Sequence, residues 1–262
     1  MSKCLTCIVA LLLAAAIARA ETVLYNGALN TAPSSQGWAY ITSGIDPVQF
    51  ASGGKTRLTT TTTRTDQAGY FSTFHPSVGV LSRVTGFDLR FDLQLLNEIH
   101  DANDRNGDTL DDRGGYSVTA ITSDLLGIEL SFWNNQVWAY DYQNTGGGFD
   151  FVHAESSIGF DPTAAKRRYD LQIHGNNYNL LADGATILSG ALRNYSAAGL
   201  VYDNPNFLFL GDDTTKAGSQ SDLYFISLNP IPEPSTIAML ALGSLTMIRR
   251  QSGGSAVLTN RR

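Results

Sequence analysis

A run of short acidic and amide side chains between Asp101 and Asp112 has the residue types and spacing of a metal-binding loop. Calcium takes about six to eight oxygen ligands at about 2.3 to 2.6 Å, and acidic residues at every second position of a tight loop aim their oxygens at one centre. The candidate ligands are the side chains of Asp101, Asp104, Asn106, Asp108 and Asp112 and the backbone carbonyl of Leu110. The spacing therefore predicts calcium as a structural cofactor.

The loop resembles the calcium loops of dockerin and thrombospondin type 3 repeats, with two departures. Counted from Asp104, Thr109 stands where a glycine belongs, and Gly115 stands where an EF-hand has its bidentate glutamate. The remaining ligands would have to come from Asp101 or Asp111. The alternative is a solvated acidic loop, since Asp, Asn and Gly are also the usual turn residues. The sequence leaves both interpretations open.

A second group of residues has the chemistry of a sugar-binding platform. Aromatic rings and amides alternate around a predicted hairpin, and the candidate ligand-binding residues are Trp133, Asn135, Trp138 and Tyr140. Aromatic faces suit sugar C–H groups, but large aromatic residues in a β-sandwich more often form its core. Asp212, Asp213 and the glycines at 146–148 are loop residues that either rim such a site or simply form turns.

Catalysis has little support in the sequence. Glycoside hydrolysis needs two carboxylates about 5 to 10 Å apart, yet the next same-strand, same-face positions after Glu129 are Ser131 and Trp133. The four histidines are scattered, without a zinc-binding pair, and the chain has no nucleophile elbow for a serine. The domain is therefore predicted to be non-catalytic.

Short alternating segments must position these groups. In Thr85–Gln94, Phe87, Leu89, Phe91 and Leu93 alternate with polar residues, as in a strand with one buried face. Similar strands are expected at 22–26, 38–41, 116–121, 128–132, 168–174, 207–210 and 222–228, and an exposed one at 59–63. Asp183-Gly184 between apolar runs predicts a hairpin. Many short strands indicate an all-β fold, an antiparallel jelly-roll β-sandwich.

Both ends of the chain carry targeting signals. Residues 1–20 have the layout of a secretory signal peptide, predicted to be helical, with Ala18 and Ala20 at the cleavage site. Both cysteines, Cys4 and Cys7, lie inside this segment, so no disulfide is expected in the mature domain. Residues 21–231 hold 12 Lys and Arg against 23 Asp and Glu, a net charge of −11 that argues against nucleic acid as a partner.

At the other end stand Pro232, Glu233 and Pro234, then the apolar run Ile237 to Ile248, then Arg249 and Arg250. A run of 12 apolar residues is shorter than the roughly 20 that span a membrane comfortably. These residues resemble the tails of PEP-CTERM proteins of Gram-negative bacteria. The resemblance implies a short hydrophobic helix that enters the inner membrane transiently, processing by an exosortase, and display on the cell surface, in the outer envelope or in the extracellular matrix.

The domain between the signals also resembles a known class. The segments TVLYNG, TGFDLRFDLQLLNE, GIELSFW and RYDLQIHGNNYNLLADGATILSG are similar to choice-of-anchor domains of type Y, and the last is also similar to strands of concanavalin A-like and laminin-G folds. The chain is accordingly divided into a signal peptide at 1–20, a β-sandwich domain at 21–229, a sorting segment at 230–250 and a disordered tail at 251–262.

Compartment, fold resemblance and acidic loop together predict a surface or matrix protein that binds extracellular polysaccharide, with calcium as its cofactor. A structural surface protein without a ligand and a polysaccharide-active enzyme are the alternatives. Retention on a glycan separates the first from the second, and release of sugar reducing ends would indicate the third.

Overall fold

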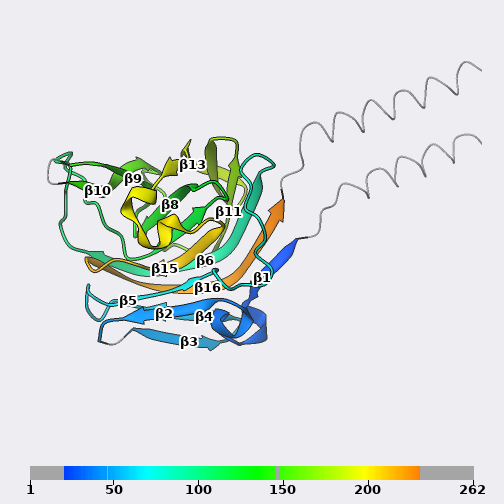
Figure 1. The fold of residues 1–262 in the computed structure, drawn as a ribbon. Coiled ribbons are helices and arrows are strands. Elements are labelled where there is room, and N and C mark those ends of the chain that lie inside the picture. The colour runs from blue at the N-terminus through cyan, green and yellow to red at the C-terminus, as the bar shows by residue number, and fades with distance from the viewer. Residues whose placement is uncertain (1–20, 46, 146–147, 231–262) are drawn as a thin grey trace, which may run out of the picture.

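Sixteen strands in the described part of the chain form two antiparallel sheets of eight strands each, which face each other across one core (Figure 1). The structure is a computed structural model that describes residues 21–45, 47–145 and 148–230. The predicted signal segment and the sorting residues Pro232, Glu233, Pro234, Arg249 and Arg250 lie outside the described residues. The all-β sandwich predicted from the alternating segments is confirmed.

Sheet A runs in the order β13-β12-β11-β6-β16-β4-β3, with β1 also paired to β16. Its strands are β1 (Thr22–Asn26), β3 (Val48–Ser52), β4 (Lys55–Thr59), β6 (Phe87–His100), β11 (Arg167–His174), β12 (Asn177–Ala182), β13 (Ala185–Ala191) and β16 (Ala217–Pro230).

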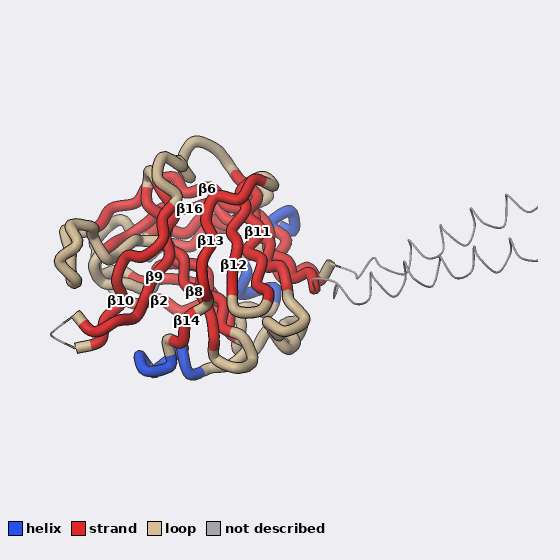
Figure 2. The backbone as a smooth tube through the Cα atoms, turned by 90° about the horizontal axis from the view of Figure 1, so that it is seen from above, coloured by secondary structure: helices blue, strands red, loops and turns tan. Residues whose placement is uncertain are grey.

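Sheet B runs in the order β10-β9-β8-β7-β15-β5-β2, with β14 also paired to β8. Its strands are β2 (Ala39–Ser43), β5 (Gln67–Phe71), β7 (Ser117–Ile121), β8 (Leu126–Trp133), β9 (Gln136–Asn144), β10 (Phe149–Ser156), β14 (Arg193–Asn194) and β15 (Phe207–Asp212). Four short 3-10 turns, η1 (Gly27–Leu29), η2 (Pro33–Gln36), η3 (Ser196–Ala198) and η4 (Leu200–Asp203), lie outside the sheets (Figure 2).

The core forms where the apolar faces of the two sheets meet. On β6, Phe87, Leu89, Phe91 and Leu93 are all buried, as the alternation predicts. The Phe91 ring from sheet A lies 6.3 Å from that of Phe132 in sheet B, in an edge-to-face arrangement. Because successive side chains point to opposite faces, the same strands must present their other residues outward.

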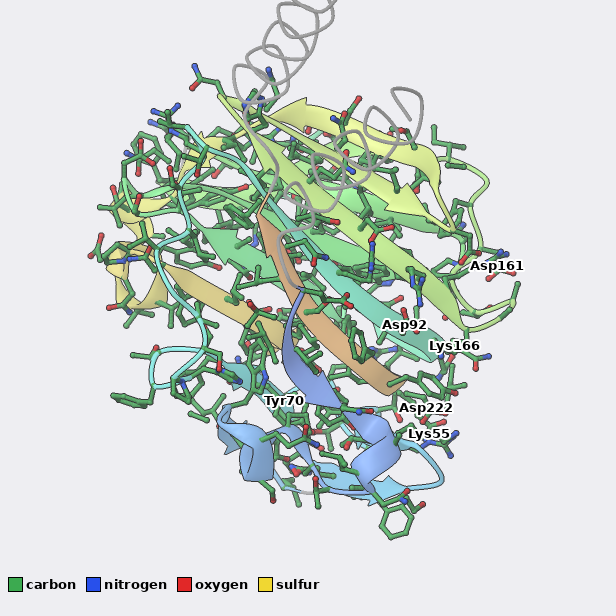
Figure 3. The ribbon with its side chains drawn as sticks, turned by 90° about the vertical axis from the view of Figure 1, so that its right-hand side faces the viewer. Lys55, Tyr70, Asp92, Asp161, Lys166 and Asp222 are labelled. Atoms are coloured by element: carbon green, nitrogen blue, oxygen red, sulfur yellow. The ribbon has the colours of Figure 1, made fainter. Side chains whose placement is uncertain are left out.

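On sheet A the outward residues form a charged face (Figure 3). Asp222 of β16 is paired with Lys55 and with Arg57, whose Nε lies 2.8 Å from the carboxylate. Asp92 of β6 accepts from Lys166 at 3.1 Å and Arg168 at 3.2 Å. Acidic and basic side chains compensate each other across neighbouring strands, so this face carries little unpaired charge.

Turn chemistry explains one prediction that is confirmed and one that is wrong. Asp183 and Gly184 take left-handed conformations, with φ of 50° and 85°, and close the β12–β13 hairpin. The exposed strand predicted at 59–63 is absent from the described structure: β4 ends at Thr59, because the buried Thr60 turns inward and its N–H donates to Ser219 O at 2.8 Å. The β3–β4 hairpin, turned by Gly53 and Gly54, was not predicted.

The two described ends of the chain lie side by side. Thr22 of β1 pairs with Leu228 of β16, so residues 21 and 230 leave the domain side by side, at one end of these two strands (Figure 1). None of the described helices has the length and apolar character needed to cross a membrane. The residues of the main core run from Leu24 to Leu228, so this core lies within the described part of the chain.

Candidate functional site

The outer face of sheet B, which points away from the core, carries the candidate site. Strand register places Phe71, Phe209, Thr119 and Glu129 in one row across β5, β15, β7 and β8. Register partners lie side by side on one face of a sheet. This row therefore brings aromatic, hydroxyl and carboxyl groups together from four strands that are far apart in sequence.

The adjacent row consists of small residues, Gly69, Gly211, Ser117 and Ser131. The absence of a side chain at Gly69 is required, because a Cβ there would lie 2.4 Å from the Phe209 ring. The tip of the Phe209 ring thus lies against the backbone of β5 at Gly69. The small residues leave room above the sheet for side chains that arrive from the loops.

A cavity of about 280 Å³ opens on this face, over β2, β5 and β15. Its walls are largely apolar and aromatic, with amide, hydroxyl and carboxyl groups at separate points, as is usual for small-molecule sites. The η4 segment closes one side. The lining residues are Ile41, Ser43, Gln67, Phe71, Thr73, Thr119, Val201, Asn204, Phe207, Phe209, Asp212 and Asp213.

Asp213 reaches the cavity wall as one half of a carboxyl pair with Glu129. The two side chains share a hydrogen bond. Glu129 is only 3% exposed, and its Oε2 also accepts from the Tyr202 hydroxyl at 2.5 Å. Asp213 is half-buried and accepts from the Ser117 hydroxyl at 3.1 Å. Glu129 is thus enclosed, while Asp213 faces the cavity.

Burial strongly affects which carboxyl group of this pair is protonated. Burial raises the pKa of Glu129 well above the ordinary 4.5, and the neighbouring Asp213 carboxylate adds to the rise. Burial also raises the pKa of Asp213, while the hydrogen bond from Ser117 opposes that rise. The hydrogen bond between the two groups opposes the rise at Asp213, as expected when the proton lies on Glu129 and points at Asp213. The pair then carries one negative charge, on the side of the cavity.

The pair lacks the geometry of the common glycoside hydrolases. Those enzymes separate their carboxyl groups by about 5 to 5.5 Å when retaining and about 6.5 to 9.5 Å when inverting. Glu129 and Asp213 share a hydrogen bond, so these two carboxyl groups are not held apart as they are in those enzymes. The arrangement can orient a bound group and attract positive charge.

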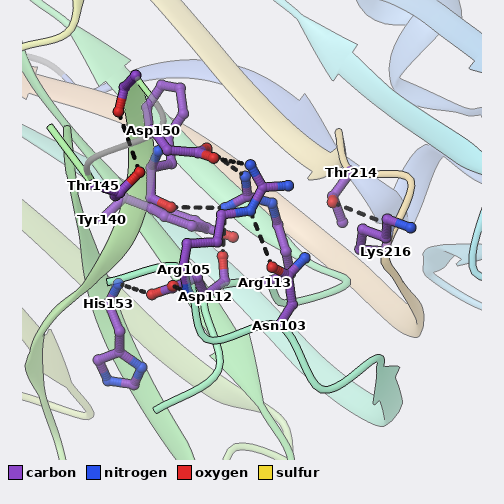
Figure 4. Close-up of polar contacts among 12 residues, drawn as sticks. Asn103, Arg105, Asp112, Arg113, Tyr140, Thr145, Asp150, His153, Thr214 and Lys216 are labelled. Atoms are coloured by element: carbon purple, nitrogen blue, oxygen red, sulfur yellow. Dashed lines mark hydrogen bonds and ion pairs between the residues drawn. The ribbon is translucent and has the colours of Figure 1, made fainter. Parts of the chain in front are cut away.

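The acidic loop predicted to bind calcium directs its carboxylate oxygens toward backbone N–H groups, as Figure 4 shows for Asp112. Asp104 accepts from the N–H groups of Gly107 at 2.7 Å and Thr109 at 2.9 Å. Asp112, fully buried, accepts from the N–H groups of Arg105 and His153, both at 2.6 Å.

The other predicted metal ligands also have partners. Asp108 accepts from the Leu110 N–H at 2.8 Å and from the Asn106 amide at 2.9 Å, and Asp101 is paired with Arg64 at 2.9 Å. Within the described residues, no group of three acidic, histidine or cysteine side chains has the placement needed to hold a metal ion. The loop as arranged here does not fit calcium, and the calcium assignment stays a prediction.

The predicted sugar platform lies in a buried aromatic cluster. Trp138 is fully buried, Tyr140 is 2% exposed and Trp133 is 8% exposed, while Asn135 is exposed in the β8–β9 turn. Trp138 and Tyr140 do share a face of β9, and the His153 ring is stacked on Trp138 with centroids 4.2 Å apart. These rings are closed to a sugar in this arrangement, because the acidic loop and the Phe151 and His153 side chains of β10 pack against them.

The predicted calcium loop and the predicted sugar platform are in direct contact in the structure. Asp112 holds the β10 backbone at His153, and Arg113 O accepts from the Trp133 indole at 2.8 Å. The acidic loop therefore serves as the cover of the aromatic cluster. Trp138 Nε1 and His153 Nε2 are buried beneath it and have no hydrogen-bond partner among the described residues.

Sequence reasoning missed the partner of Glu129. A search along its own strand finds Ser131 and Trp133, whereas Asp213 arrives from the end of β15. The sequence signal that could have identified this partner was the Asp212-Asp213 pair, which follows the apolar strand predicted at 207–210. These two residues were predicted only as the rim of a site or as a turn. Strand order, which brings β15 next to β7 and β7 next to β8, was the missing information.

Comparison with known proteins identifies the tail. Residues 230–251 match the PEP-CTERM protein-sorting motif. The chain carries an exosortase sorting signal. Such a motif indicates export to the cell surface of a Gram-negative bacterium. The match concerns the tail alone, and among curated proteins none matches this chain.

Solved structures with a similar fold cover most of the chain. The carbohydrate esterase vb_24B_21 from the Shiga toxin-encoding bacteriophage phi24B is 13% identical, with a TM-score of 0.52, over 82% of this chain and 100% of its own. The Bacillus licheniformis β-glucanase is 10% identical, with a TM-score of 0.41, over 80% of this chain and 99% of its own. Alginate lyase A1-II' is 11% identical, with a TM-score of 0.41, over 71% and 84%. At these identities the comparison concerns the fold alone.

Proposed function

We propose that the mature domain is a non-catalytic, surface-displayed protein that binds extracellular polysaccharide in the cavity of sheet B. The observation that carries this proposal is the cavity itself, with aromatic walls formed by Phe71, Phe207 and Phe209 and polar groups from Gln67 and Asn204. Apolar walls with a few placed polar groups suit sugar rings, which present C–H faces and hydroxyl edges.

The volume and the compartment support the same proposal. About 280 Å³ is enough for one or two sugar units, and a protein sorted to the cell surface meets polysaccharide there. The bacteriophage carbohydrate esterase shares the fold at 13% identity, so that likeness lends no mechanism. The similarity of the domain to choice-of-anchor domains of type Y stays a prediction beside this proposal.

The test is retention of residues 21–230 on the exopolysaccharide of the producing organism. We expect wild-type protein to be retained and Phe71→Ala to lose roughly tenfold in affinity, since one aromatic contact contributes about 0.5 to 1.5 kcal/mol beyond its buried area. Phe50→Ala is the matched control, because Phe50 is 62% exposed on β3 and lies outside the cavity.

Two results would contradict the proposal. One is passage of the wild-type domain through the polysaccharide without retention. The other is equal retention of the Phe71 and Phe50 variants, which would place binding elsewhere on the surface. Release of reducing ends by the wild-type domain would instead indicate an enzyme.

A further inference from the structure

The charge of the cavity points to the kind of sugar that it takes. Two of its lining residues, Asp212 and Asp213, are acidic, and Glu129 lies directly behind Asp213. None of the described lining residues is a lysine or an arginine. The cavity thus has a source of negative charge and no positive group to hold an anion.

Of these three carboxyl groups, Asp213 is the one that can act on a ligand. Asp212 is 1% exposed, and its carboxylate is held by the Thr60 hydroxyl and by the N–H of Thr214 at 3.1 Å. Glu129 is enclosed by Tyr202. Asp213 is half-buried, lines the cavity and accepts a hydrogen bond from the Ser117 hydroxyl at 3.1 Å.

The aromatic walls of the cavity also favour a positively charged ligand. Ring faces attract cations through their quadrupole, with about 0.5 to 2 kcal/mol depending on desolvation. Phe71 and Phe209 stand in the same row as Glu129 and line the cavity with Asp213. A cation placed in the cavity would meet a carboxylate on one side and aromatic faces on the other. The net charge of −11 over residues 21–231 draws cationic polymers toward the domain.

We propose that the cavity binds an amino sugar with a free, protonated amine, so that the polysaccharide it recognises contains de-N-acetylated hexosamine units. This inference rests on the proposed function and narrows it. The ammonium group lies against Asp213, and the sugar ring lies against the phenylalanine walls. Uronate and sulfated polysaccharides are rejected, because their anions would face Asp213, and the nearby Arg113 is already paired with Asp150 at 2.9 Å.

The experiment measures binding of three hexamers of differing charge to residues 21–230 by calorimetry, slightly below neutral pH. The probes are a glucosamine hexamer, an N-acetylglucosamine hexamer and a galacturonate hexamer. A charged contact a few ångströms from Asp213 in a partly desolvated site corresponds to a preference of about tenfold or more. We expect the glucosamine hexamer to bind best and the galacturonate hexamer not at all.

Asp213→Asn should remove the preference between the first two hexamers. Asp161→Asn is the matched control, because it removes the same unit of charge from an exposed turn outside the cavity and should leave the preference intact.

Val201→Lys is a second test that avoids the buried pair. Val201 is 39% exposed at the rim, and a lysine there should weaken the glucosamine hexamer about tenfold more than it weakens the N-acetylated hexamer.

Equal binding of the three hexamers, or a preference that survives in Asp213→Asn, would overturn the inference. Retention on the native polysaccharide would then still support the proposed function. If none of the hexamers binds, the amino-sugar assignment is wrong, and the exopolysaccharide experiment decides separately whether the cavity binds any glycan.

Discussion

At the scale of single residues, the domain holds a carboxyl group where a carboxylate would be costly. Glu129 is 3% exposed and faces the aromatic side of sheet B. Removing a charge from water costs several kcal/mol unless it is compensated, so the side chain keeps its proton and bonds to Asp213 and Tyr202. Burial of the Glu129 side chain is favourable only while its carboxyl group remains protonated.

The pH dependence of unfolding tests this assignment. Because the pKa of Glu129 is raised in the folded state, the folded protein binds more protons than the unfolded chain at pH values above the ordinary 4.5. The free energy of unfolding therefore falls as pH rises through that window. Glu129→Gln carries no titrating group, so its stability relative to wild type should grow, by at most about 1.4 kcal/mol per pH unit.

Thermal unfolding from mildly acidic to alkaline pH measures this difference. Glu155→Gln is the control, because the side chain of Glu155 is 35% exposed and pairs with Arg193 at the surface; it should keep the wild-type profile. A constant stability difference between Glu129→Gln and wild type at every pH would contradict the buried, protonated glutamic acid.

At the scale of elements, period-two alternation and turn chemistry were sufficient to predict most strands. The strand predicted at 22–26 matches β1, and β6, β7, β8, β11, β15 and β16 contain or overlap their predicted segments. Prediction was poor where residues distant in sequence decide the local structure. Thr60 leaves the strand direction because Ser219 and Asp212 bind it, and neither contact is visible in a β-branched run.

The candidate site was less predictable than the fold for the same reason. Trp138 and Tyr140 have the composition of a sugar platform, yet the acidic loop, about 30 residues earlier in the chain, covers them. Asp213 and Glu129 are chemically ordinary in sequence and become a pair only through strand order. Residue types can be identified from the sequence, whereas their partners depend on topology.

The β12–β13 turn provides a test of backbone conformation alone. Gly184 has a φ of 85°, and a Cβ there would meet no atom within 4 Å, so an alanine would suffer from the dihedral angle and not from a clash. We expect Gly184→Ala to lower the free energy of unfolding by about 1 to 2 kcal/mol.

Gly79→Ala is the matched control for this turn. Its Cβ would also meet open space, but its φ lies outside the left-handed region, so the change should be neutral or slightly stabilising. Urea unfolding of both variants gives the comparison. Equal destabilisation of the two would show that the hairpin tolerates other turn conformations.

The acidic loop is an element whose two interpretations predict different melting behaviour. In the first interpretation, the Asp104 carboxylate accepts hydrogen bonds from the backbone N–H groups of Gly107 and Thr109, and Asp104→Ala loses them. The melting temperature then falls by about 2 to 4 °C, equally with calcium and with EDTA. The arrangement in the structure favours this result.

Calcium binding would give the opposite pattern. Calcium would then raise the melting temperature of wild-type protein, EDTA would reverse the rise, and Asp104→Ala would abolish it. Asp161→Asn, in an exposed turn outside the loop, should respond like wild type in either case.

At the scale of the whole molecule, the first and last described strands lie next to each other in sheet A. β1 pairs with β16 and contributes Leu24 and Tyr25, which are 2% and 0% exposed. The Tyr25 hydroxyl bonds to Thr56 at 2.9 Å, and the Trp38 indole donates to Leu24 O at 3.0 Å. Two of the six residues after the predicted signal cleavage site are therefore part of the core.

This architecture sets a limit on where the signal peptide is removed. Loss of a buried leucine costs about 2 to 5 kcal/mol and loss of a buried aromatic residue about 3 to 5, against a typical total stability of about 5 to 15. A protein of residues 27–230 should therefore melt at least about 10 °C below residues 21–230, or show no cooperative transition. Mass spectrometry of the exported protein should accordingly find Glu21 as its first residue. Equal melting of the two proteins would show that β1 is dispensable and that cleavage can occur further along the chain.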